Sequence, residues 1–266
     1  MRGIIAVGLV VVSLISYCNM KQTNPVTGES QHVAMSTSQE VALGLEAAPQ
    51  MAAQHGGEVK TGPDAELVHA MGQHLVRTYF RDKENPYRFE FHLLADEKVI
   101  NAFALPGGQV FITRALYNRL ETEGQLAGVL GHEIGHVIER HGAEHMAKAQ
   151  LTQGLTSAAA MAAYDPEKPG TAAAAAVAQM VGNLVNMKYG RNDELESDEW
   201  GIDLCVQAGY DPRAMIGVME ILDEATKSGR PPEFMSSHPD PGNRIGRLEE
   251  LIAAKFPNGV PRDLEP

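Results

Sequence analysis

Cysteine is scarce in this chain of 266 residues, which contains only Cys18 and Cys205. So few cysteines cannot build a disulfide framework, and stability must come from core packing and from any bound metal. Positive charge is also in short supply, since 22 Lys and Arg face 34 Asp and Glu, for a net charge of −12. An acidic balance argues against nucleic acid as the main partner. Hydrophobic residues make up 44% of the chain, which is enough for a globular core.

The apolar run near the N-terminus, from Ile4 to Ile15, is too short for a membrane span, which needs about 20 apolar residues. After Arg2, such a short run predicts a secretory signal. The stretch Leu14-Ile15-Ser16-Tyr17-Cys18 resembles a bacterial lipobox, which implies cleavage before Cys18 and lipid on its thiol. Tyr17 stands where a small residue is usual, so a plain signal peptide and an uncleaved anchor remain alternatives.

Three segments are expected along the chain. Residues 1–17 are a signal peptide, residues 18–35 a polar tether with a turn at Asn24-Pro25-Val26-Thr27-Gly28, and residues 36–266 one domain. Apolar spacing predicts helices over about 39–50, 65–80, 114–120, 121–145, 171–188, 193–207, 211–227 and 243–255. Strands are predicted around 89–93, 101–103 and 109–113, the last two flanking a Gly-Gly turn. The fold class is therefore α+β, mostly helical, with a small sheet placed early.

The chemistry centres on His132-Glu133-Ile134-Gly135-His136. Residues four apart on a helix differ by about 40° around its axis, so the two imidazoles face one side. Neutral imidazoles at this spacing can hold two corners of a tetrahedral zinc, and Glu133 can take a proton from zinc-bound water. The pentapeptide also occurs by chance. Here apolar residues surround it, which predicts a buried helix in which an ionisable Glu requires a reason.

A catalytic zinc needs a third protein ligand and one open position. His141 and His145 lie off the ligand face of the predicted helix, so they are weak candidates. Glu194 and Asp198 are four residues apart, and Glu194 can be the ligand while Asp198 accepts a hydrogen bond from a ligand imidazole. The alternative explanation is an acidic helix start exposed to solvent.

Five motifs in this order resemble the M48 family of metallopeptidases, especially its bacterial periplasmic lipoprotein branch, with kinship to mitochondrial inner-membrane quality-control peptidases. They are Asn-Pro-Val-Thr-Gly at 24–28, Asn-Ala-Phe-Ala-Leu-Pro-Gly-Gly at 101–108, the pentapeptide at 132–136, Glu194-xxx-Asp198 and Ser237-His238-Pro239. The resemblance implies a zincin-like domain over 36–266. It also implies one zinc held by His132, His136 and Glu194, with Glu133 as general base and Asp198 behind the ligands.

The resemblance further implies that a strand pairs with extended substrate, either around Ala102, Phe103 and Ala104 or around Val110 and Ile112. A lone His in a Pro-rich loop is usually a surface residue. The resemblance instead places His238 near the zinc, where it stabilises the oxyanion or occupies the open metal position. Arg244 would anchor that loop or support the transition state.

The leading hypothesis is a periplasmic endopeptidase, lipid-anchored to the outer membrane, that acts on misfolded or misassembled envelope proteins. A chaperone or assembly factor with a latched or silent zinc site is the alternative. A structural zinc protein is a third hypothesis, which requires four protein ligands.

Overall fold

The computed structural model describes residues 2–163, 189–227, 232–239 and 243–266. The helix predicted over 171–188 lies outside these residues. The chain divides into two compact units, one formed by Met1–Ser36 with Arg140–Met187 and the other by Thr37–Glu139 with Lys188–Pro266. The predicted fold class is confirmed, since helices predominate and the sheets are small.

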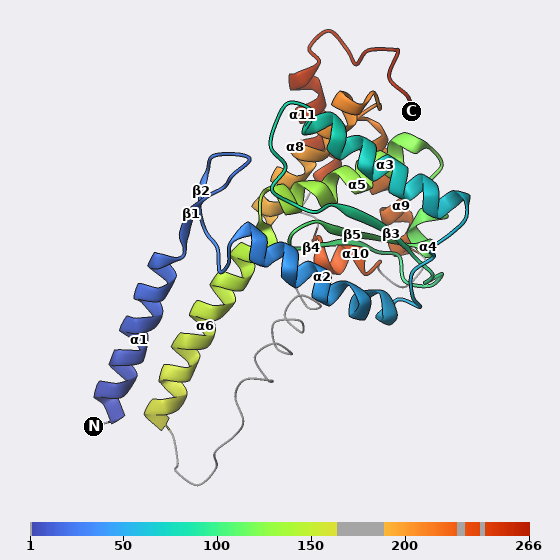
Figure 1. Ribbon diagram of the computed structural model, residues 1–266. Coiled ribbons are helices and arrows are strands. Elements are labelled where there is room, and N and C mark those ends of the chain that lie inside the picture. The colour runs from blue at the N-terminus through green and yellow to red at the C-terminus, as the bar shows by residue number, and fades with distance from the viewer. Residues whose placement is uncertain (1, 164–188, 228–231, 240–242) are drawn as a thin grey trace. The chain divides into compact units, whose positions relative to one another are not determined.

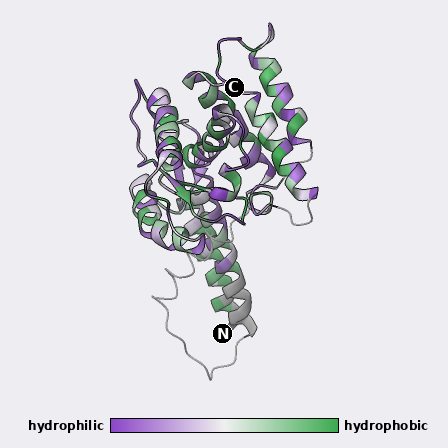
Figure 2. Cartoon of the chain, turned by 90° about the vertical axis from the view of Figure 1, so that its right-hand side faces the viewer, coloured by the Kyte–Doolittle hydropathy of each residue, from purple (hydrophilic) through white to green (hydrophobic). Residues whose placement is uncertain are grey.

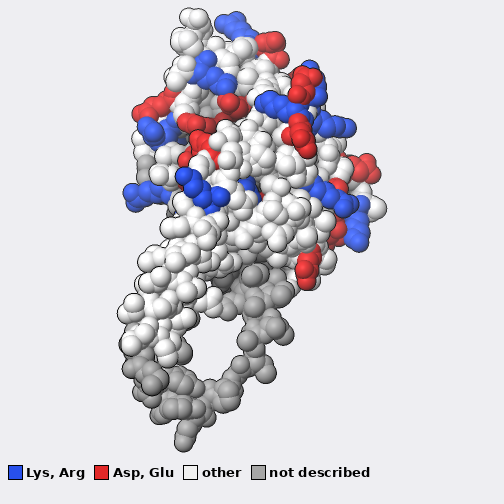
Figure 3. Space-filling view, turned by 60° about the vertical axis from the view of Figure 1, so that its left-hand side comes forward, with Lys and Arg blue, Asp and Glu red and all other residues white. Residues whose placement is uncertain are grey.

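The first unit consists of a helix pair and a β-hairpin. Helix α1 (Arg2–Asn19) packs against α6 (His141–Ala163), and β1 (Lys21–Thr23) pairs antiparallel with β2 (Ser30–His32). The side-chain oxygen of Asn24 accepts hydrogen bonds from the backbone N–H groups of Val26 and Thr27, which closes the predicted turn. In Figure 3 the lower, described part of this surface is white, whereas the Glu144–Lys148 ion pair lies near the start of α6. Among the described residues, no helix combines the length and apolarity needed to cross a membrane.

The second unit is built on a three-stranded sheet in the order β3-β5-β4 (Figure 1). Its strands are β3 (Glu90–Leu94), β4 (Ala102–Leu105) and β5 (Gln109–Thr113). The central strand, β5, runs parallel to β3 and antiparallel to β4. The turn between β4 and β5 contains Gly107 and Gly108 with φ of 83° and 115°, a conformation that favours glycine. The predicted Gly-Gly hairpin is thus confirmed.

Helices enclose this sheet on both faces. Helices α3 (Pro63–Tyr79) and α5 (Glu123–Ile138) pack on one face, and α2 (Thr37–Gln54) contacts the other (Figure 1). The remaining helices are α4 (Arg114–Tyr117), α8 (Arg191–Ala208), α9 (Ala214–Lys227), α10 (Phe234–Ser237) and α11 (Arg244–Lys255). In Figure 2 the loops at the surface of this unit are largely purple, whereas green stretches are concentrated in its helices and strands.

Helix α5 carries the pentapeptide and is shorter than the sequence predicts. Thr122 caps its start by accepting a hydrogen bond from the N–H of Gln125. The helix ends at Ile138, and Arg140 adopts a left-handed conformation with φ of 59°. The prediction of one helix over 121–145 is therefore wrong, because a non-glycine residue in this conformation interrupts the helical path.

Helices α5 and α8 cross at very close range, and glycine makes this possible. A Cβ built on Gly135 would lie 2.8 Å from Cβ of Trp200 and 3.0 Å from Cα of Ser197. One built on Gly131 would lie 3.2 Å from Cα of Gly201. Real Cβ atoms almost never approach as closely as 2.8 Å, and a contact of 3.2 Å is tighter than most, so Gly135 in particular allows the two backbones to lie this close. The crossing brings the pentapeptide of α5 beside the acidic residues of α8.

Candidate metal centre

His132 and His136 lie one turn apart on α5, and their imidazoles face the same point as predicted. Their Nε2 atoms are 3.1 Å apart, and both side chains are almost fully buried. Burial holds the pKa of His136 well below its ordinary value. That imidazole is therefore neutral, which is the form that binds a metal.

Helix α8 directs Glu194 into the same cluster. One carboxylate oxygen lies 3.5 Å from Nε2 of His132 and the other 3.5 Å from Nε2 of His136. Burial alone would raise the pKa of Glu194, but the charge of His238 and hydrogen bonds from the three histidines hold it well below the usual range. Glu194 is fully buried, so the alternative of a solvent-exposed acidic helix start is wrong for this residue.

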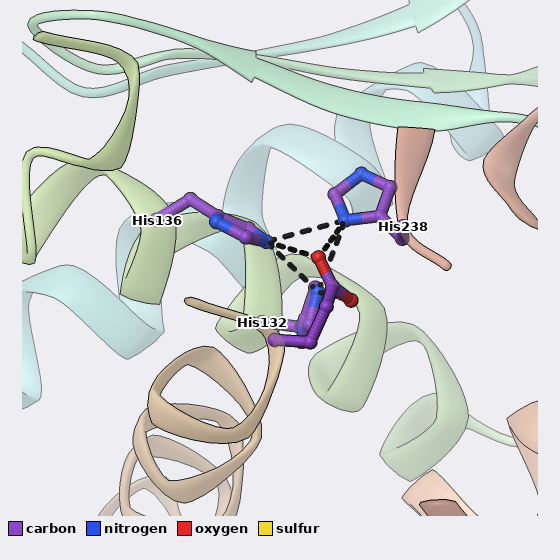
Figure 4. Close-up of side chains that lie close together, drawn as sticks. His132, His136 and His238 are labelled. Carbon is purple, nitrogen blue, oxygen red and sulfur yellow. Dashed lines mark hydrogen bonds and ion pairs between the residues drawn. The ribbon is translucent and has the colours of Figure 1, made fainter. Parts of the chain in front are cut away.

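His238 completes the cluster from the segment that follows α10. Its Nδ1 lies 3.4 Å from Nε2 of His132, 3.2 Å from Nε2 of His136 and 3.0 Å from Oε1 of Glu194. Figure 4 shows the three labelled imidazoles converging around the carboxylate. His238 is 0% exposed, so the surface interpretation of this histidine is wrong.

These four groups fit a tetrahedral zinc. Their candidate ligand atoms all lie within 4.8 Å of one another. Donors about 2.0–2.1 Å from a tetrahedral zinc are separated by about 3.4 Å, which matches the 3.0–3.5 Å between the atoms here. Three buried imidazole nitrogens and a carboxylate form a donor set of the kind that zinc prefers. His141 and His145 begin the separate helix α6 and are not part of this set.

Glu133 stands beside the cluster without a hydrogen bond to either carboxylate oxygen among the described residues. Its Oε1 lies 3.5 Å from Nε2 of His238, and the residue is 0% exposed. Burial raises the pKa of the Glu133 carboxyl, and the facing His238 and His132 offset this only in part. A buried carboxyl with no hydrogen bond destabilises the fold, so its presence indicates a chemical role.

Asp198 and Arg244 form the layer behind the cluster. Asp198 accepts a 3.0 Å hydrogen bond from Nδ1 of His132, which leaves Nε2 directed at the other ligand atoms. Arg244 donates to Asp198 from Nε at 2.8 Å and from Nη2 at 2.7 Å, and its Nη1 lies 3.0 Å from Glu194. One guanidinium therefore holds both carboxylates of α8. This placement supports Arg244 as a positioning residue.

Two aromatic residues that sequence reasoning missed enclose the histidines. Tyr189 stacks on His136 with ring centroids 3.9 Å apart, and Phe234 stacks on His238 at 4.3 Å. The backbone N–H of Tyr189 also donates to the carbonyl of Ser237, beside His238. The only available sequence signal was an aromatic residue shortly before each ligand motif, which is too common to identify such a role.

The two strands proposed for substrate pairing differ in whether one of their edges is open to another strand. β5, with Val110 and Ile112, is paired on both sides, so the expectation that it receives a substrate strand is wrong. β4 lies at the edge of the sheet. The carbonyl of Asn101 accepts a hydrogen bond from the backbone N–H of Thr113, the last residue of β5. Backbone groups alternate in direction along a strand, so those of Phe103 face β5, whereas those of Ala102 and Ala104 face away from it.

Comparison with known proteins agrees with a metal centre of this kind. Residues 63–252 match the family described as Peptidase family M48. The beta-barrel assembly-enhancing protease of Escherichia coli (strain K12) is 34% identical over 191 residues, which cover 68% of this chain and 37% of the relative. That of Yersinia pestis is 31% identical over 83% of this chain and 45% of the relative. The mitochondrial metalloendopeptidase OMA1 of Homo sapiens is 28% identical over 94% and 49%. The chain thus spans less than half the length of these relatives.

Proposed function

The chain belongs to peptidase family M48, and from this membership we propose that it is a zinc-dependent endopeptidase that cleaves polypeptides with a metal-activated water. One observation carries the proposal. Glu133 is a fully buried carboxylate to which none of the described residues donates a hydrogen bond, and it lies directly beside a donor set that fits zinc. A protein that only bound polypeptides, or that used zinc only for stability, would gain nothing from such a group.

The side chains have distinct roles in this proposal. Bound zinc would lower the pKa of a water and polarise the scissile carbonyl. Glu133 would accept a proton from the attacking water and pass it to the leaving amine. Asp198 fixes the tautomer of His132, and Arg244 contacts the carboxylates of Glu194 and Asp198 and holds them in place. No covalent intermediate on the protein is needed.

His238 has two states in this proposal. Its Nδ1 lies among the other three candidate ligand atoms, so in this position His238 would be a fourth ligand of a bound zinc and would latch the site. Withdrawal of His238 would leave room for a water beside Glu133, and the imidazole would then stabilise the oxyanion. The latched geometry is also the observation that favours the second candidate function, a chaperone or assembly factor with a silent site.

The substrates that we propose are unfolded or misassembled proteins of the bacterial envelope. The relatives from Escherichia coli and Yersinia pestis carry the name beta-barrel assembly-enhancing protease, and the outer edge of β4, which no other described strand pairs with, offers backbone groups to an extended chain. We place the protein in the periplasm, attached to the outer membrane by lipid on Cys18, which is exposed near the end of α1. Mass spectrometry of the mature N-terminus tests this anchor, and an unmodified Cys18 would contradict it.

The central test compares wild type with Glu133→Gln. We expect casein cleavage to fall by about 10²–10⁴-fold, the usual contribution of a general base, with one zinc per chain retained. Glu196→Gln, an exposed change on α8, is the control and should cleave normally. Undiminished cleavage by Glu133→Gln would refute the mechanism. Wild-type protein that holds zinc and binds casein without cleaving it would favour the chaperone.

A further inference from the structure

Tyr189, which lies just before α8, contacts two of the candidate ligands. Its ring stacks on the imidazole of His136, with the ring centroids 3.9 Å apart and the planes inclined by 23°. The same ring lies 5.1 Å from the imidazole of His238, at an angle of 36°. Tyr189 is 8% exposed, so both contacts lie in the interior of the second unit. One aromatic face therefore covers one histidine of the cluster and borders another.

The backbone of Tyr189 is joined to the segment that carries His238. Its N–H donates a 3.0 Å hydrogen bond to the carbonyl of Ser237. At the other end of this segment, the N–H of Phe234 donates a 3.2 Å hydrogen bond to the carbonyl of Ile100, just before β4. The segment is therefore held at both ends, and the bond to Ser237 fixes the backbone from which the tyrosine ring projects.

The candidate ligands differ in what holds them from behind. His132 donates a hydrogen bond to Asp198, and Glu194 is held by Arg244. On His136 the tyrosine ring lies face to face with the imidazole. The face of an aromatic ring carries partial negative charge, whereas an imidazole becomes electron-poor when its nitrogen binds a metal. The stacking is therefore more favourable when the imidazole is bound to zinc than when it is free.

We propose that Tyr189 is a positioning residue of the metal centre, whose ring holds the imidazole of His136 in the plane in which its Nε2 meets the zinc. This inference rests on the proposed function, since it concerns the ligands of that zinc. In this role Tyr189 touches neither the substrate nor the attacking water. What the centre requires is the aromatic face, and neither the volume of the side chain nor its hydroxyl group replaces it.

The first test separates the aromatic face from the space that it fills. Tyr189→Leu keeps most of the buried volume but removes the face, and zinc affinity should fall by roughly tenfold, near the upper end of what one aromatic pair contributes. Tyr189→Phe keeps the face and should retain an affinity within about twofold of wild type. Competition with a zinc-chelating dye measures both affinities.

Phe80→Leu is the matched control. Phe80 has the same exposure of 8%, and its aromatic contacts are with Tyr79 and Phe89 and with none of the histidines of the cluster. This variant should lose stability to denaturant as Tyr189→Leu does, but its zinc affinity should equal that of wild type. The comparison distinguishes a ring that positions a ligand from one that only packs.

The second readout is how the kinetic effect divides between kcat and KM. A residue that acts through the metal centre affects the transition state and not substrate binding, so Tyr189→Leu at saturating zinc should lower kcat by roughly tenfold with KM for a casein peptide unchanged. A raised KM with unchanged kcat would make Tyr189 a substrate contact and would overturn the assignment.

Two affinity results would also overturn it. Wild-type zinc affinity in Tyr189→Leu would show that the face is not needed, and an equal loss in Tyr189→Phe would transfer the role to the hydroxyl group. The affinity measurement requires no turnover. It therefore decides this inference separately from the proposed function, which fails if zinc-loaded wild-type protein cleaves no peptide.

Discussion

Asp198 connects His132 and Arg244, two side chains with roles in the proposed mechanism. We expect Asp198→Ala to weaken zinc binding by about 10–100-fold, because His132 loses the acceptor that fixes its tautomer. Competition with a zinc-chelating dye measures the affinity. Glu199→Ala changes an exposed carboxylate on the same helix and should leave the affinity unchanged. Equal affinities for wild type and Asp198→Ala would show that Arg244 alone suffices to orient the ligands.

Cys205 illustrates a residue with no part in the chemistry. It is 0% exposed, and burial, followed by the nearby Asp211, raises the pKa of its thiol to about 12. Because the thiolate is the reactive form, a thiol reagent should label Cys205 very slowly in native protein and stoichiometrically in denaturant. The measurement uses a Cys18→Ser variant. Rapid labelling of the native protein would contradict the buried position.

The sequence indicated which residues would lie together in the cluster because their spacing is a consequence of helix geometry. His132 with His136, and Glu194 with Asp198, are each four residues apart. The contacts of Tyr189 and Phe234 could not be predicted, since they depend on how segments far apart in the chain meet. Arg244 was predictable only in part. Its proximity to His238 in the sequence is visible, but its contacts with the carboxylates of Glu194 and Asp198 are not.

At the scale of elements, the crossing of α5 and α8 determines the distance between the two halves of the metal centre. Gly135→Ala would force α8 away, since the new Cβ would lie 2.8 Å from Trp200. Overpacking of this kind costs about 1–3 kcal/mol, so we expect lower stability to denaturant and weaker zinc binding together.

Gly217→Ala is the matched control for this crossing. Its new Cβ would approach the flexible amide end of Gln125, which can move aside. We expect Gly217→Ala to retain wild-type zinc affinity. If Gly135→Ala behaved in the same way, the close approach of the two helices would not be what positions Glu194.

The elements themselves show where pattern reasoning succeeds and fails. The three strands of the second unit followed from alternation and from the Gly-Gly turn, both of which are local signals. The end of α5 was missed because Glu139 and Arg140 have ordinary helix propensity, and only the left-handed conformation of Arg140 stops the helix. The β1–β2 hairpin was missed because its strands are short and polar, without an apolar face.

At the scale of the whole molecule, bound metal should contribute to stability. Zinc binds the folded centre and not the unfolded chain, so saturation at 1,000 times the dissociation constant adds about 4 kcal/mol. For a protein of this size we expect chelation to lower the melting temperature by roughly 10 °C in calorimetry. A Glu194→Gln variant should show a much smaller shift on chelation. An unchanged wild-type melting temperature would contradict a metal integrated into the fold.

The outer edge of β4, which no other described strand pairs with, has another consequence. Outward backbone groups can pair with any extended chain, including β4 of a second copy, and such pairing leads to aggregation. β4 is only four residues long, and the hydrogen bond from Phe234 to Ile100 already occupies one acceptor at its start. Two copies joined along so short an edge would gain few hydrogen bonds. A peptide bound at the metal centre would gain the same hydrogen bonds and a second point of attachment. The short length of β4 therefore disfavours self-association but still allows a substrate to bind.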